Sequence, residues 1–135
     1  GFNPKMINHI YGAAKIYDTR SGIDPLFPDS LLKNSELYKL GELGEEYGVT
    51  THRRRTVNWL NLNKLIYAIN VSGTTHLIIS KIDIIAELNV YKLIHNSETI
   101  IFHNLENMKT HIDSTIRSEC KFITSIIYSN SPEKI

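Results

Sequence analysis

The chain has 135 residues, of which 41% are hydrophobic and 21% are charged, proportions that are ordinary for a globular domain large enough to bury a core. Its formal net charge is +1, so no overall field attracts a nucleic acid, and its hydrophobic runs are too short to span a membrane. The one cysteine, Cys120, cannot form an internal disulfide and no signal-peptide pattern opens the chain, so we expect a cytoplasmic protein.

The first third of the chain predicts two helices separated by a long loop. The sequence starts at Gly1 rather than at a methionine, so we expect a longer parent chain. Apolar residues recur at spacings of three and four, which predicts a helix over 4–17. Residues 21–29 are rich in glycine, proline and aspartate and predict a loop. A polar helix over 34–46 follows.

The middle of the chain predicts an extended loop, a helix and a strand. Residues 49–56 have no helical periodicity. Asn58 is the expected N-cap of the next helix, whose apolar face begins at Trp59 and which ends at Ser72-Gly73. The apolar run 76–80 predicts a buried strand, and a helix followed by such a strand indicates a parallel sheet.

The last third predicts a β-hairpin, a helix and a final strand. Strands over 90–95 and 98–103 flank a tight Asn96-Ser97 turn. Apolar residues at helical spacing predict a helix over 105–117, and 121–128 predicts a strand. We therefore expect one α/β unit over 1–135, with a mostly parallel sheet flanked by helices and a small β-hairpin.

Three consecutive arginines form the strongest local feature. In extended backbone, Arg53 and Arg55 point the same way and Arg54 points the opposite way, so two guanidinium groups can converge on one anion. The hydroxyls of Thr50 and Thr51 add hydrogen bonds, and together these groups match a small dianion. The alternative is a solvated basic surface; a nucleic-acid patch lacks accompanying aromatic residues.

Lys81-Ile82-Asp83 follows the predicted strand 76–80 and has the K-x-D form with which GTP-binding proteins recognise guanine. Its carboxylate can accept hydrogen bonds from the base, and ligands of open α/β sheets bind at the carboxyl ends of strands. A charged strand end without function is the alternative.

No catalytic residue and no metal site is expected in this chain. The six histidines show no spacing typical of metal ligands. No phosphate-binding glycine loop and no nucleophile motif is present. If the chain serves an enzyme, the catalytic groups belong to another part of it.

Four segments resemble one enzyme family when taken together and in order. Residues 46–55, followed by Trp59-Leu60, resemble the aspartate-binding loop of adenylosuccinate synthetases. The segments 12–22, 77–85 and 129–134 are similar to three further segments of the same family. The resemblance covers nearly the whole chain and implies that it is the C-terminal part of such an enzyme, with the N-terminal catalytic half absent.

The resemblance also implies residue roles. Aspartate binding falls to Val49, Thr50, Thr51, Arg53 and Arg55; IMP binding to Ser21, Gly22 and Arg53; and GTP binding to Arg55, Lys81, Asp83, Ser129, Asn130 and Ser131. Four positions depart from the family pattern: His52 and Asn58 replace glycines, Thr56 replaces an arginine, and Ser131 replaces a glycine of the base loop.

Family enzymes use GTP to phosphorylate the 6-oxygen of IMP, and the amine of L-aspartate then displaces the phosphate. The resemblance implies Mg²⁺, held by the N-terminal half and the nucleotide phosphates, and a homodimer for the full enzyme; no nucleic acid or membrane partner is expected. Because the catalytic base, acid and phosphate loop are missing, we expect this chain alone to be inactive.

Two alternatives remain open. One is the related bacteriophage 2-aminoadenylosuccinate synthetase, which joins aspartate to dGMP with ATP and is suggested by the altered base loop. The other is a nucleotide-binding module without catalysis. A GDEGKGK-like segment upstream of Gly1 would indicate an enzyme and a nearby start codon the module, whereas nucleotide preference distinguishes the two enzymes.

Overall fold

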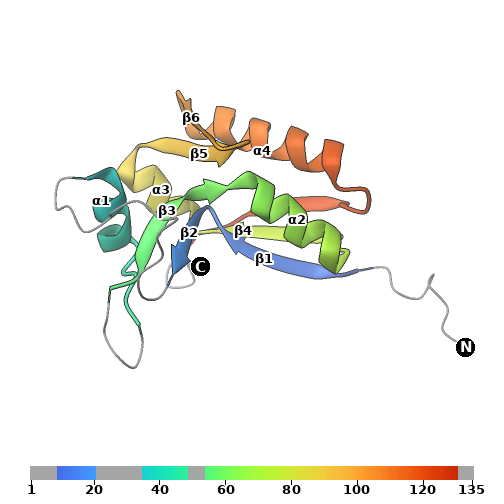
Figure 1. Cartoon of the computed structure of the whole chain (residues 1–135), viewed down its shortest axis with the longest axis horizontal. Helices are drawn as coiled ribbons and strands as arrows, with labels where there is room; N and C mark the ends of the chain where they lie inside the picture. The colour runs from blue at the N-terminus through green and yellow to red at the C-terminus, as the bar shows by residue number, and fades with distance from the viewer. Residues whose placement is uncertain (1–8, 21–34, 49–53, 131–135) are drawn as a thin grey trace, which may run out of the picture.

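The computed structural model describes residues 9–20, 35–48 and 54–130 (Figure 1). Three strands form a parallel sheet in the order β1-β4-β7, with bounds β1 Tyr11–Lys15, β4 His76–Ser80 and β7 Ser125–Tyr128. Since all three strands run the same way, their carboxyl ends meet at one edge of the sheet. That edge carries the candidate site described below.

Four more strands form a mixed sheet in the order β2-β3-β5-β6, with bounds β2 Tyr17–Arg20, β3 Thr56–Asn61, β5 Tyr91–His95 and β6 Glu98–Phe102. β3 is antiparallel to β2 and parallel to β5, and β5 and β6 form the expected hairpin. The α/β fold class is therefore confirmed, although the strands divide between two sheets.

The predicted helix over 4–17 is wrong in its described part, because residues 11–20 form β1 and β2. The chain changes from one sheet to the other at Ile16, which is fully buried and donates its backbone N–H to the oxygen of Ser80 at 3.0 Å. Tyr17 is buried directly after it. Consecutive buried residues at this crossing break the alternation of a strand, and the apolar spacing that remains imitates a helix.

Asn58 does not cap a helix; it lies inside β3, where Val57 to Leu60 are all buried. The helix α2, Leu62–Ser72, begins one residue after Asn61, whose side chain accepts from the N–H of Lys64 at 3.1 Å. A fully buried strand that runs directly into a helix has no periodicity of its own, so the boundary could not be placed from the sequence. The predicted end is confirmed, because Gly73 adopts φ 70°.

The remaining helices are α1 Glu36–Leu43, α3 Ile82–Leu88 and α4 Leu105–Glu119. α1 and α4 confirm predicted helices, whereas α3 was not predicted because it is only seven residues long. α1 packs on α3 and β3, and α4 packs on the hairpin and on α2 (Figure 1).

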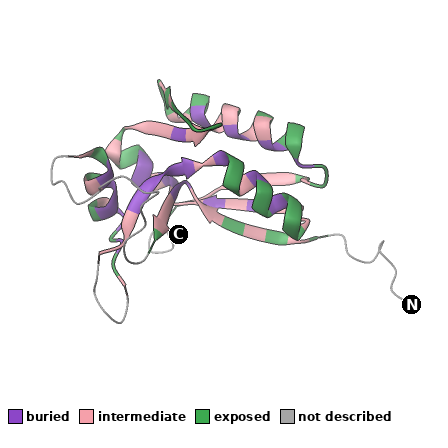
Figure 2. Ribbon diagram, in the orientation of Figure 1, coloured by how far each residue is buried: buried purple, intermediate pink, exposed green. Residues whose placement is uncertain are grey.

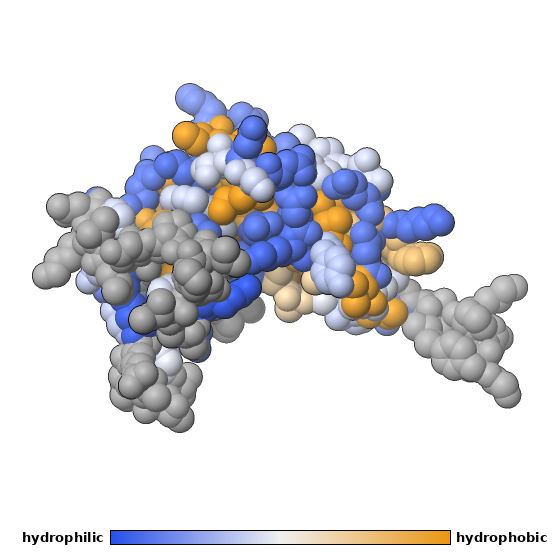
Figure 3. All heavy atoms as spheres, viewed as in Figure 1, coloured by the Kyte–Doolittle hydropathy of each residue, from blue (hydrophilic) through white to orange (hydrophobic). Residues whose placement is uncertain are grey.

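The buried hydrophobic residues of these strands and helices form one cluster. Figure 2 marks the buried positions along the ribbon. α4 contributes Met108, Ile112 and Ile116, all at 0% exposure and spaced at four residues as one helix face requires. Figure 3 shows a mainly hydrophilic face with small separate hydrophobic groups. No helix among the described residues is long and apolar enough to cross a membrane.

Candidate functional site

The loops that follow β4 and β7 are hydrogen-bonded to each other. The N–H of Ser129 donates to the oxygen of Ile79 at 2.8 Å, and the N–H of Ile82 donates to the oxygen of Ser129 at 3.1 Å. Lys81 lies between these two bonds in the left-handed conformation, with φ 69°, and turns the chain into α3. Asp83 lies in the first turn of that helix. Two segments far apart in sequence therefore form one small platform.

Most of the predicted base-site residues that are described lie on this platform. Lys81, Asp83 and Ser129 are half-buried, and Asn130 is exposed beside them. A half-buried carboxylate at a strand end can accept hydrogen bonds from a ligand while keeping part of its hydration. The arrangement suits an aromatic base that carries N–H donors.

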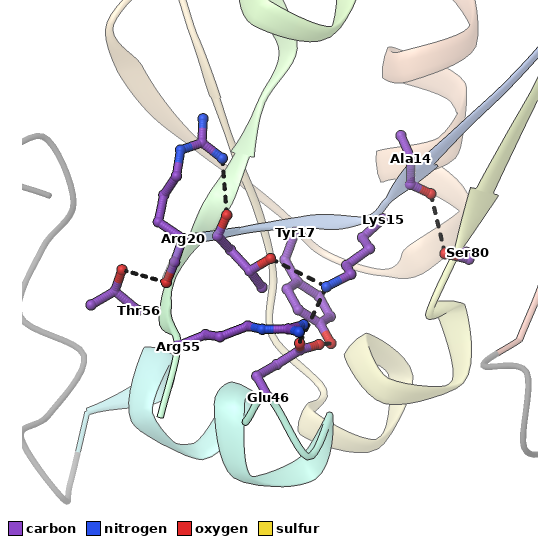
Figure 4. A network of polar contacts seen from close by, with 9 residues as sticks. Ala14, Lys15, Tyr17, Arg20, Glu46, Arg55, Thr56 and Ser80 are labelled. Atoms are coloured by element: carbon purple, nitrogen blue, oxygen red, sulfur yellow. Dashed lines mark hydrogen bonds and ion pairs between the residues drawn. The ribbon is translucent and has the colours of Figure 1, made fainter. Parts of the chain in front are cut away.

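A buried carboxylate, Glu46, organises the neighbouring charges (Figure 4). Its side chain is only 3% exposed and binds Lys15 Nζ at 3.2 Å and Arg55 Nη1 at 3.3 Å. The hydroxyl of Tyr17 donates to its other oxygen. Burial of a charge is tolerable when it is paired and hydrogen-bonded, and the two cations leave this cluster with a surplus positive charge.

The Glu46 cluster adjoins the platform. Lys15, the last residue of β1, is the register partner of Ser80, the residue just before Lys81. Ser80 Oγ donates to the oxygen of Ala14 at 3.2 Å, which joins the same two strand ends (Figure 4). Glu46 binds both Lys15 and Arg55, so Arg55 lies near the edge where β1, β4 and β7 end.

Arg54 is directed elsewhere, as alternation in extended backbone requires. Its guanidinium stacks on the ring of Tyr38, with 3.9 Å to the ring centroid, and donates to the backbone carbonyl oxygen of Tyr38 at 2.6 Å. It also pairs with Glu42. Arg54 and Arg55 thus bind different carboxylates. Arg54 holds α1 in place, and Arg55, which is 31% exposed, keeps donors available to a ligand.

The two arms of the predicted aspartate loop are held together at its base. The N–H of Arg55 donates to the oxygen of Glu46 at 3.0 Å, and Tyr47 and Arg54 form an antiparallel bridge. The loop itself, 49–53, lies outside the described residues. So do these predicted site residues and departures: Ser21, Gly22, Val49, Thr50, Thr51, His52, Arg53 and Ser131.

An open cleft of about 580 Å³ borders the Glu46 cluster between β1, β2 and α2. Lys15, Asp18, Arg20 and Lys64 line it. Burial raises the pKa of Asp18, although the N–H of Asn61, Arg20 and Lys64 act in the opposite direction. Sequence reasoning did not identify Lys15, Glu46 or this cleft; Lys15 and Glu46 both lie in family-like segments, which was the available signal.

Comparison with known proteins decides the family. The family model described as adenylosuccinate synthetase matches residues 1–124. The chain belongs to the adenylosuccinate synthetase family. An adenylosuccinate synthetase named as chloroplastic, from Ostreococcus lucimarinus, is 42% identical over 93 residues, covering 69% of this chain and 21% of that protein. The enzyme of Petrotoga mobilis is 43% identical over 93 residues, covering 69% and 22%.

The fold agrees with a solved member of the adenylosuccinate synthetase family. The fully ligated enzyme from Plasmodium falciparum superposes with a TM-score of 0.66 at 22% identity, covering 96% of this chain and 39% of that chain. The matched region spans about a fifth of the length of the curated relatives from Ostreococcus lucimarinus and Petrotoga mobilis. Among its described residues, no three or more histidine, cysteine, aspartate or glutamate side chains are grouped to hold a metal ion.

Proposed function

We propose that residues 1–135 form one unit, the C-terminal part of a cytoplasmic, homodimeric adenylosuccinate synthetase that joins IMP and L-aspartate with GTP hydrolysis. Arg55, with the loop residues Val49, Thr50, Thr51 and Arg53, binds aspartate; Arg53 together with Ser21 and Gly22 binds IMP. Lys81, Asp83, Ser129, Asn130 and Ser131 bind the guanine of GTP, and Arg55 also contacts this nucleotide.

One observation carries this proposal. The hydrogen bonds of Ser129 to the strand end and to Ile82 gather the K-x-D segment and the loop after β7 at a single edge, and the Glu46 cluster brings Arg55 to the same edge. The segment proposed to bind guanine and the guanidinium of Arg55, proposed to bind aspartate, therefore lie in one region. We propose that the N-terminal part of the family enzyme, together with the nucleotide phosphates, holds Mg²⁺.

The Asp83 carboxylate is the proposed determinant of base choice. Guanine presents N–H donors at N1 and N2 that a carboxylate can accept, whereas adenine presents a bare acceptor at N1. A site built to accept those donors rejects the base that lacks them, because its own polar group then stays unpaired. We expect GTP to bind at least about tenfold more tightly than ATP, a difference of about 1.4 kcal/mol.

Calorimetric titration of the chain with GTP, ATP, IMP and dGMP tests this assignment. Asp83→Asn keeps the size of the side chain but turns one acceptor into a donor, so the preference for GTP should disappear. Glu87→Gln, one turn further along α3 and exposed, is the matched control and should bind as the wild type does.

Equal binding of every nucleotide by the wild type would contradict the site assignment. A preference for ATP together with dGMP would favour the bacteriophage 2-aminoadenylosuccinate synthetase reaction instead. Incubation of these 135 residues with IMP, L-aspartate and GTP should yield no adenylosuccinate, because we place the base, acid and phosphate loop that stabilise the transition state in a part of the family enzymes that these residues do not span. Product formation by the chain would overturn that expectation.

A further inference from the structure

We propose that His95 and His111 form a two-histidine chelating site for a divalent transition metal of the Zn²⁺ and Ni²⁺ class, which fastens the β5–β6 hairpin to α4. His95 is the last residue of β5, next to the hairpin turn, and His111 lies in the middle of α4. Neither residue belongs to the proposed nucleotide or aspartate site. The two histidines are 16 residues apart in sequence.

The distance between the two ring nitrogens suits a shared metal ion. His111 Nε2 and His95 Nδ1 are 3.3 Å apart, and the ring centroids are 5.4 Å apart at an interplanar angle of 74°. Two nitrogens bound to one tetrahedral Zn²⁺ at about 2.0–2.1 Å are separated by about 3.4 Å. Chelation requires that the proton shared between the two facing nitrogens is released and that both lone pairs turn toward the ion.

The ring of His111 is held by a contact that does not use the nitrogen facing His95. His111 packs on Phe102, with ring centroids 5.3 Å apart, and both histidines are half-buried. Imidazole is a preferred ligand for Zn²⁺, Ni²⁺ and Cu²⁺ and a poor one for Mg²⁺. The arrangement therefore selects a different class of metal from the one that accompanies a nucleotide.

Room for the remaining ligands lies beside His95. A polar cleft of about 360 Å³ is lined by His95, Asn96, Ser114, Thr115, Ser118 and Glu119, so water can complete the coordination. Glu98 is the register partner of His95 in the antiparallel hairpin, and directly opposed residues share one face of a sheet. Its exposed carboxylate is not grouped with the two histidines, so we expect water rather than Glu98 to supply the remaining ligands.

The test uses the untagged 135-residue chain, freed of metal, and titration with ZnCl₂, NiCl₂ or MgCl₂ alone. We expect one Zn²⁺ or Ni²⁺ per chain by calorimetry, no response to Mg²⁺, and a rise in the unfolding temperature with Zn²⁺, because a ligand that binds only the folded state stabilises it. His95→Asn and His111→Asn should each weaken Zn²⁺ binding at least tenfold and abolish the thermal shift.

His103→Asn is the matched control, since His103 is an exposed histidine at the other end of the same hairpin and should leave binding unchanged. Circular dichroism identifies variants that fail to fold. If a histidine variant fails to fold, the NMR signals of the histidine rings in the wild-type chain are followed as Zn²⁺ is added, and those of His95 and His111 should shift. Glu98→Gln is a second control and should leave Zn²⁺ binding unchanged, because the Glu98 carboxylate is not grouped with the two histidines.

Two results would overturn the proposal. One is the absence of Zn²⁺ or Ni²⁺ binding to the wild type, which would leave a simple imidazole hydrogen bond. The other is binding that survives His95→Asn and is lost in His76→Asn, since His9 and His76 form a second close pair with ring centroids 4.6 Å apart. In that case the metal site would lie at the start of β4.

Discussion

Single side chains decide the geometry of the charged cluster at the sheet edge. Glu46 is buried, yet it is hydrogen-bonded to a tyrosine and paired with two cations, and these partners compensate for its burial and fix its position. The cluster depends on a close approach of backbone at Gly44. A Cβ at that position would lie 2.3 Å from the hydroxyl of Tyr17 and 3.2 Å from a carboxylate oxygen of Glu46.

Gly44→Ala should therefore destabilise the fold by about 1 to 3 kcal/mol, the usual cost of overpacking a buried site. Chemical denaturation of the variant and the wild type measures this difference. In a Tyr17→Phe background the added methyl group loses its nearest clash, so the same change should cost less. Equal costs in both backgrounds would show that the Tyr17 hydroxyl is not what excludes a side chain at position 44.

The stability of the fold should depend on pH through His111. Burial, and then the charge of His95, lowers the pKa of His111 from its ordinary value of 6.5. The unfolded chain therefore binds the proton more readily, and the stability that neutral His111 contributes is present above about pH 6.5 and lost as the pH falls through and below that value. In metal-free buffer, His111→Gln should reduce this acid sensitivity. An unchanged pH profile would contradict the burial of His111.

At the scale of elements, local patterns were sufficient where an element has its own period or its own turn. α4 has a single apolar face, and the β5–β6 hairpin has an Asn-Ser turn at which both residues adopt positive φ, 52° and 65°. β1, β2 and β3 were missed because their burial depends on partners distant in sequence. The backbone of Ile16 is hydrogen-bonded to Ser80 at the end of β4, whereas Tyr17 pairs with Trp59 of β3, and no window of neighbouring residues contains that information.

The hairpin turn carries a measurable strain at Ser97. A serine at φ 65° costs free energy that glycine does not, and an Asn-Gly pair suits a two-residue turn of this kind. Ser97→Gly should raise the free energy of unfolding by about 0.5 to 1 kcal/mol. Asn96→Gly is the comparison. The backbone N–H and the side chain of Asn96 both form hydrogen bonds with Asn63, so this variant should gain less stability than Ser97→Gly or lose stability. A loss in Ser97→Gly would contradict the assigned turn.

For the whole molecule, the α/β class and the family could be predicted from the sequence, and the division into two sheets could not. The placement of Lys81-Ile82-Asp83 after a parallel strand was predicted from the apolar run before it and is confirmed, although only Leu77 and Ile79 of that strand are buried. The contact of that segment with Ser129 depends on β7 lying beside β4, which the order of elements alone does not determine. The role of Glu46 was missed for a similar reason, because its partners come from β1, β2 and the far arm of the loop.

Recognition of guanine is proposed to take place at the edge formed by the ends of β4 and β7. It can be tested by following the backbone amide NMR signals of the ¹⁵N-labelled chain during titration with GTP and, separately, with ATP. We expect GTP to shift the amide signals of Lys81, Asp83 and Ser129 at concentrations at which ATP leaves them unchanged. Shifts of equal size with both nucleotides, or shifts confined to the cleft at Asp18 and Lys64, would contradict it.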